Sequence, residues 1–140
     1  MTELNFNTGR RTFKINDSVE VSFNDTDAAF VEKLYNVFEN LDAKQERYRN
    51  RAERTADKKE IFSVMRDMDR EIKDDINNLF EKDVCSPLFG DMNVFALADG
   101  LPLWANLMLA IMEQVDSAFA REQNATNPRV QKYTAKWQRK

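Results

Sequence analysis

A long apolar segment, residues 93–123, most constrains how this chain of 140 residues folds. Within the segment, apolar side chains recur at spacings of three and four residues, which is typical of a helix. They are Leu103, Leu107, Ala110, Ile111 and Val115, with Leu109, Met112 and Phe119 widening the stripe. A stripe this wide must be covered on several sides. We therefore expect a central helix over about 102–123, against which the other elements pack.

The composition indicates one folded domain that is rich in helix. Hydrophobic residues make up 42% of the chain, which contains ten Phe but only three Gly and three Pro. Few chain breakers favour long helices over a β fold with many turns. We predict a single α+β domain over residues 1–123, followed by a basic C-terminal tail over 124–140.

The first part of the chain reads as β-structure. Apolar and polar residues alternate through residues 3–23, and turn-forming residues interrupt the alternation at 7–9 and 16–18. This pattern predicts a small antiparallel meander of two or three strands with one apolar face. Because so few strands are marginally stable alone, that face must pack on the helices.

A first helix is predicted over about 25–53, after the β-meander. With Asn24 as its N-cap, Asp25 and Asp27 would lie in the first turn, where carboxylates interact favourably with the helix dipole. The C-terminal part of this helix is almost wholly polar, and Tyr48 is its only large apolar side chain. We expect this end to project from the core or to face a partner.

A second helix is predicted over about 57–82. Asp57, followed three residues later by Glu60, has the character of a capping box. Two long amphipathic helices favour an antiparallel helical hairpin, while one unbroken helix through residues 43–60 is an open alternative. The fold class is therefore α+β and mostly α, with a β-meander packed on a bundle of long helices.

The segment between the second and central helices contains both breakers and apolar residues. Pro87 and Gly90 predict a loop over residues 83–90, and residues 92–98 are expected to form a short helix. Pro102 suits a first-turn position and would open the central helix.

Side chains that carry catalysis are scarce. The chain has no histidine, and its one cysteine, Cys85, is expected to be a small buried hydrophobe rather than a reactive thiol. The carboxylates of residues 67–75 alternate with basic residues and lack the spacing of a calcium loop, so we expect a solvated charged face. No glycine pattern for phosphate binding is present. The sequence thus predicts a protein that is not an enzyme, without catalytic, cofactor or metal residues.

Charge narrows the range of partners. Residues 1–123 carry 16 basic and 24 acidic side chains, a net charge of −8. An acidic body argues against binding of nucleic acid or of an anionic membrane. The longest apolar run, residues 101–112, is too short to span a bilayer, and no secretory signal opens the chain. We expect a soluble protein of a reducing, intracellular compartment.

Protein partners are the remaining expectation, and three places suit them. Tyr48 lies on the polar end of the first helix, and Leu88 and Phe89 lie in the predicted loop. Tyr133 and Trp137 are spaced i,i+4 in the basic tail, so a helical tail would place both on one stripe for docking. Alternatively, the tail folds back onto its own acidic body.

Four segments together resemble a known family. They are FNDTDAAFVEKLYNVFENLD, TADKKEIF, CSPLFGDMNVFALADGLPLWANLMLAIM and FAREQNATNPRVQKYT. They resemble small proteins that phages and prophages of Gram-positive gut bacteria encode among tail-morphogenesis genes, with the weakest resemblance over residues 1–20. By gene position, that family is similar to tail assembly chaperones, which coat the tape-measure protein before the tail tube polymerises.

The resemblance implies a function in the cytoplasm of the host cell. We expect a non-enzymatic tail assembly chaperone or morphogenesis factor that binds helical segments of a tape-measure or other tail protein, and that associates with itself. The alternative is a small phage protein that inhibits or triggers a host defence protein, since an acidic body can occupy a basic channel. Binding of the second kind should weaken steeply with salt.

Overall fold

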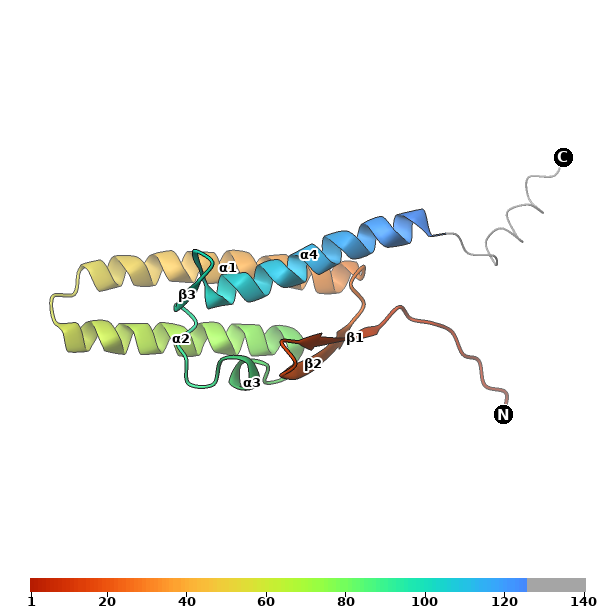
Figure 1. Ribbon diagram of the computed structural model, residues 1–140, viewed down its shortest axis with the longest axis horizontal. Helices are drawn as coiled ribbons and strands as arrows, with labels where there is room; N and C mark the ends of the chain where they lie inside the picture. Colours follow the sequence, from red (N-terminus) through yellow and green to blue (C-terminus); the bar gives the residue numbers. More distant parts are fainter. Residues whose placement is uncertain (126–140) are drawn as a thin grey trace.

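The computed structural model describes residues 1–125 and has the predicted α+β, mostly α architecture. Figure 1 shows two long helices, α1 and α2, side by side, with a third, α4, lying along α1. A β-hairpin packs at one end of this bundle. The predicted tail, apart from its first two residues, lies outside the described residues.

The N-terminal sheet has two strands. Strand β1 (Arg11–Ile15) pairs antiparallel with β2 (Val19–Phe23), with Phe13 opposite Val21. The predicted alternation is confirmed here, because the three apolar residues of β2 are buried and its two polar residues are exposed. The prediction of a strand before residue 10 is wrong. Residues 1–10 form no strand or helix, and Leu4 and Phe6 are 88% and 77% exposed.

Helix α1 (Ala28–Glu53) begins three residues later than predicted. The Oδ1 atom of Asn24 accepts hydrogen bonds from the backbone N and the Oγ1 of Thr26, both at 2.8 Å. This side-chain bond turns the chain before the helix can start. Asp27 is therefore the N-cap, accepting from the N of Ala29 at 2.9 Å. The prediction of Asn24 as N-cap is wrong, and Asp25 is buried instead of lying in the first turn.

The helical hairpin is confirmed, and the unbroken-helix alternative is wrong. Helix α2 (Lys58–Phe80) begins after Asp57, whose side chain accepts from the N of Lys59 at 3.0 Å, as the capping pattern predicts. At the other end, Glu81 adopts a left-handed conformation with φ of 54°, which ends the helix.

The segment before α4 differs from its prediction. Cys85–Phe89 forms a short helix, α3, where a loop was expected. A second hairpin, β3 (Leu97–Ala98) and β4 (Leu101–Pro102), replaces the end of the short helix predicted over residues 92–98. Asp99 and Gly100 both have positive φ, 54° and 79°, and an Asp-Gly pair is a strong signal for a tight hairpin turn.

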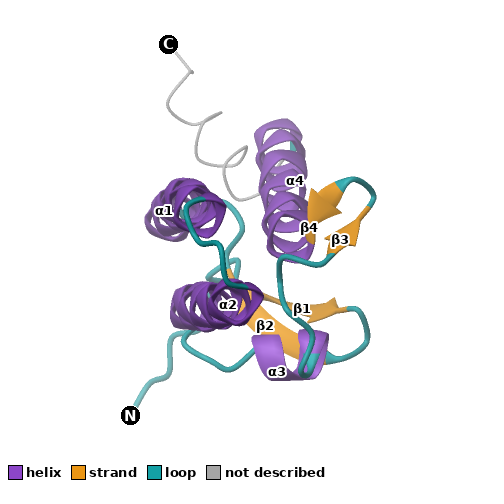
Figure 2. Ribbon diagram, turned by 90° about the vertical axis from the view of Figure 1, so that its left-hand side faces the viewer, coloured by secondary structure: helices purple, strands orange, loops and turns teal. Residues whose placement is uncertain are grey.

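Helix α4 (Leu103–Asn124) matches the predicted boundaries to within one residue. It contributes seven buried residues, but it is not surrounded as expected. Figure 2 looks along the helices and shows α1, α2 and α4 at the corners of a triangle, with β3 and β4 beside α4. On its side toward β1, α4 lines a groove through Leu107, Ala110 and Ile111.

Candidate functional site

The C-terminal end of α1 is attached to α2 through Tyr48, which was predicted to lie on a projecting segment. The Oη of Tyr48 donates to Glu71 Oε2 at 2.6 Å, and its ring is half-buried. One turn earlier, the Nζ of Lys44 contacts Glu71 Oε1 at 3.0 Å and also the carboxylate of Asp75. The prediction of a projecting helix end is wrong, because these side chains pair α1 with α2 along this stretch.

The same contacts change how these groups titrate. The hydrogen bond from Tyr48, followed by that from Lys44, holds the pKa of Glu71 below its ordinary value of 4.5. The bond to Glu71 in turn raises the pKa of Tyr48. Burial alone would lower the pKa of Lys44, but its bonds to Asp75 and Glu71 outweigh burial and raise it.

The lowered pKa of Glu71 predicts an acid-sensitive junction between α1 and α2. A depressed carboxylate pKa contributes stability that is fully present above the unfolded value of 4.5 and is lost as the pH falls through the folded value. Urea denaturation at pH 7 and pH 3.5 should therefore show that acid lowers the free energy of unfolding less for Glu71→Gln than for the wild type. An equal decrease in both proteins would contradict the assignment of this acid sensitivity to Glu71.

Part of the acidic segment of α2 is occupied by contacts and is not a solvated face. Asp69 Oδ1 accepts from the backbone N of Val94 at 2.7 Å, and Lys73 Nζ donates to the carbonyl of Met92 at 2.9 Å. Asp69 and Lys73 also pair with each other at 3.0 Å. These bonds hold the chain that leads from α3 to β3 against α2. The prediction of a solvated face fails for these two residues, as it does for the pair that binds Lys44.

One apolar groove lies beside Tyr48, between the hairpin of α1 and α2 and the hairpin of β3 and β4. We call it the Tyr48 groove; it has a volume of about 240 Å³. Its walls are Gln45, Tyr48, Arg49, Ala52, Val64, Met65, Met68, Phe95, Leu97 and Pro102. Leu97 is 72% exposed. Gln45 also accepts a hydrogen bond from Trp104 Nε1 at 2.7 Å, which fixes α4 against α1.

A second apolar groove runs between strand β1 and helix α4, with α3 at one end. It consists of two adjoining hollows of about 240 and 190 Å³. We call it the β1 groove; its apolar walls are Phe13, Ile15, Val21, Phe23, Leu88, Phe89, Leu103, Leu107, Ala110 and Ile111. Leu88 and Phe89 are half-buried on α3.

The sequence-predicted partner residues are therefore not gathered at one place. Tyr48 lines one groove, whereas Leu88 and Phe89 line the other. Tyr133 and Trp137 lie outside the described residues. Sequence reasoning missed Leu97, because the segment around it was expected to be helical. The Asp-Gly pair that follows it is the signal that could have found the hairpin.

A larger hollow of about 520 Å³ lies between β2, the start of α1 and the end of α2. Its walls combine the aromatic rings of Phe30 and Phe80 with charged residues of both signs, such as Lys33 and Glu81. No buried side-chain nitrogen or oxygen in residues 1–125 lacks a hydrogen-bond partner. The walls therefore offer no unpaired buried group that would select a ligand.

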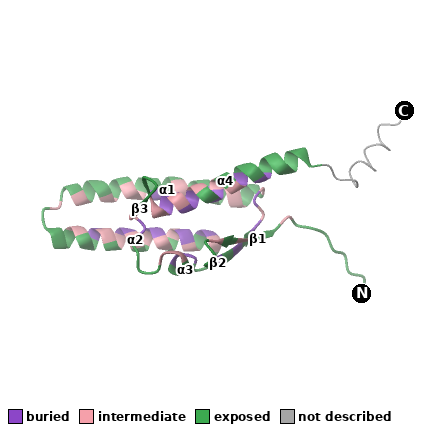
Figure 3. Cartoon of the chain, viewed as in Figure 1, coloured by how far each residue is buried: buried purple, intermediate pink, exposed green. Residues whose placement is uncertain are grey.

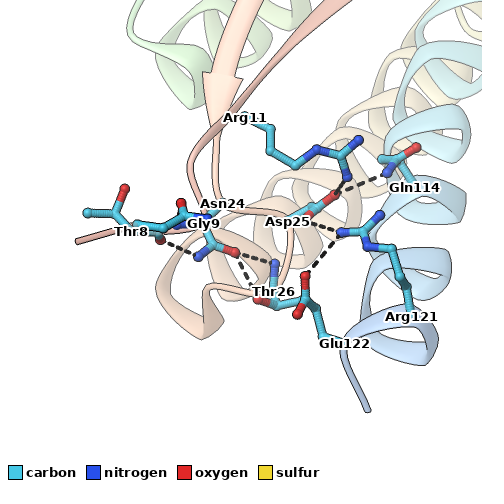
Figure 4. A network of polar contacts seen from close by, with 10 residues as sticks. Thr8, Gly9, Arg11, Asn24, Asp25, Thr26, Gln114, Arg121 and Glu122 are labelled. Atoms are coloured by element: carbon cyan, nitrogen blue, oxygen red, sulfur yellow. Dashed lines mark hydrogen bonds and ion pairs between the residues drawn. The ribbon is translucent and has the colours of Figure 1, made fainter. Parts of the chain in front are cut away.

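Asp25 joins the β-hairpin to α4. Its side chain is 2% exposed, and its Oδ2 accepts from Gln114 Nε2 at 3.0 Å and from Arg11 Nη1 at 3.4 Å. Arg121 approaches the other oxygen at 3.7 Å and also pairs with Glu122 (Figure 4). These partners come from β1 and from α4, so the carboxylate fixes the position of α4 relative to β1.

Cys85 is buried, as predicted, and burial raises the pKa of its thiol to about 12. Since the thiolate is the reactive form, this side chain is not activated for nucleophilic chemistry. No group of three acidic or cysteine side chains within residues 1–125 is placed to hold a metal ion.

Comparison with known proteins adds no identification: no protein-family model, curated protein or solved structure matches this chain. Over the described part of the chain, no helix combines the length and the apolar character needed to cross a membrane.

Proposed function

We propose that this chain is a non-enzymatic phage tail assembly chaperone, or a related morphogenesis factor, in the cytoplasm of the host cell. It binds a helical segment of a phage structural protein, such as the tape-measure protein, in the Tyr48 groove. The observation that carries the proposal is an apolar groove walled by two helices, with Leu97 left 72% exposed at its edge. The resemblance of the four sequence segments to small tail-region phage proteins supports the phage setting.

The chemistry of the Tyr48 groove suits an amphipathic helix. Helices bind in grooves of this kind by laying an apolar stripe along the floor. Met65 and Met68 line the groove, and their flexible thioether side chains adapt to different apolar partners. Gln45 and Arg49 at the walls can bond the polar flanks of the bound helix. An adaptable groove is what a chaperone that covers successive helical segments requires.

Affinity capture of the full-length chain from phage-induced cells tests this function. Tagged wild-type protein should recover the tape-measure protein or another tail protein, identified by mass spectrometry. Leu97→Asp should reduce that recovery by at least about tenfold, because it places a charge against the apolar stripe of the bound helix. Ala98→Asp is the matched control, since it adds the same charge to an exposed neighbour on the opposite face of β3 and should leave recovery unchanged.

Three results would count against the proposal: recovery of no tail protein, equal recovery by the two variants, or capture of a host defence protein alone. In the last case, salt dependence distinguishes the mode of binding. Loss of the complex between low and moderate salt would favour occupation of a basic channel by the acidic body, whereas an apolar contact persists.

A further inference from the structure

The first seven residues form an arm that extends away from the body of the protein (Figure 1). Its apolar side chains alternate with polar ones, as in a strand with one apolar face. Leu4 and Phe6 are 88% and 77% exposed, and Figure 3 shows the arm as exposed throughout its length before Gly9. No contact within the described chain covers this apolar face.

Contacts at the base of the arm set its direction. Asn24 Nδ2 donates to the carbonyl of Thr8 at 2.8 Å (Figure 4). Asn7 Oδ1 accepts from the N of Gly9 at 2.8 Å. Gly9 has φ of 74°, and a Cβ atom at this position would lie 2.5 Å from Asn24 Nδ2. These contacts keep the arm from folding back to pair with β1 of its own chain, which is the hairpin that the alternation alone predicts.

Strand β1 offers an unpaired edge within the described residues. It pairs only with β2, so every second residue of β1 directs its N–H and C=O groups away from the sheet. The β1 groove lies between the apolar face of the hairpin and α4. One wall is Phe13 and Ile15 of β1 with Val21 and Phe23 of β2, and the other is Leu107 and Ile111 of α4. An extended chain added along β1 would gain backbone hydrogen bonds at the edge and could direct alternate apolar side chains into this groove.

We propose that the arm of one copy adds as a third strand to β1 of a second copy, with Leu4 and Phe6 in the β1 groove, and that the exchange is reciprocal. Each copy carries both surfaces that the contact needs. One is the uncovered apolar face of the arm, and the other is the β1 groove beside the unpaired edge of β1. Reciprocal exchange closes the assembly as a two-fold dimer instead of an open fibre. The arm carries Glu3 and the groove carries Lys14, so the charges at the contact are opposite.

This dimer contact lies outside the Tyr48 groove, so the experiment that tests it is independent of the experiment that tests the proposed function. Sedimentation velocity of the full-length protein should show a dimer that dissociates in the range of about 1–100 μM. Phe6→Asp should raise the dissociation constant by at least about tenfold, because it removes an apolar anchor and buries a charge. Asn5→Asp adds the same charge to the opposite face of the arm and should leave dimerisation unchanged.

A second pair of substitutions, one test and one control, examines the β1 groove. Ala110 is exposed and lines both hollows of the groove, so Ala110→Glu should block the groove without disturbing the core. Ala120→Glu, exposed further along α4, is the control. An equimolar mixture of Phe6→Asp and Ala110→Glu should associate more than either variant alone but less than the wild type. The mixed dimer keeps one of the two reciprocal contacts, in which the intact arm of one variant meets the intact groove of the other. A wild type that stays monomeric, equal behaviour of the two members of either matched pair, or a mixture that associates no more than the separate variants would overturn the proposal.

Discussion

Replacing Ile72 by alanine is expected to lower the free energy of unfolding by about 3–4 kcal/mol. Ile72 lies in the middle of α2, is 0% exposed and belongs to the core that α1, α2, α4 and the β-hairpin share. The substitution removes apolar contacts and leaves a cavity that helices joined by the Lys44 and Tyr48 bonds cannot easily close. Urea denaturation followed by circular dichroism measures the change.

The control for this substitution lies on the same helix. Phe62 is 58% exposed near the start of α2, so Phe62→Ala should change the free energy of unfolding by less than about 1 kcal/mol, although it deletes a larger side chain. If the two substitutions destabilise the protein equally, the packing of α2 described above is wrong. The comparison therefore tests which face of α2 is turned to the core.

Replacing Asp25 by alanine is expected to cost about 2–3 kcal/mol of the free energy of unfolding. The substitution deletes a buried acceptor that binds Gln114 and Arg11 and leaves those donors without this partner. Because Arg11 and Arg121 remain about half exposed, water replaces part of what they lose, and the full penalty of a buried ion pair does not apply. The measurement is again chemical denaturation.

Two further variants separate the role of Asp25 from a general effect of charge. Asp25→Asn keeps one acceptor oxygen for Gln114 and should cost less than Asp25→Ala. Asp17→Asn removes the same charge from a side chain that is 93% exposed and pairs weakly with Lys14 at 3.7 Å, and Asn tolerates the φ of 54° at this position, so it should have almost no effect. Equal destabilisation by Asp25→Ala and Asp17→Asn would show that the buried contacts contribute nothing.

Local patterns were sufficient to predict much of the fold. The alternation of β2, the cap at Asp57 and the apolar stripe of α4 each act within a few residues, and the structure confirms all three. The break between α1 and α2 follows from that cap. The hairpin of β3 and β4 also depends on a local signal, because the Asp-Gly pair favours a tight turn over the helix predicted for residues 92–98.

Other features depend on contacts between residues that are distant in sequence. Asn24 could cap a helix or bond Thr26, and only its additional contact with Thr8 shows why the turn forms there. The sequence around Tyr48 predicts an exposed residue, because its partner, Glu71, lies on another helix. Burial of this kind depends on the facing surface, which no short window of sequence contains.

The sequence by itself determined the class of this protein: apolar periodicity, caps and few chain breakers specify an α+β chain built mainly of long helices. The tertiary structure alone decided which apolar surfaces are closed and which stay open. The stripe of α4 is covered by α1 on one side and left as a groove beside β1 on another, and the N-terminal arm is turned away from that groove. Periodicity states that a face is apolar; only the packing of distant elements determines what covers it.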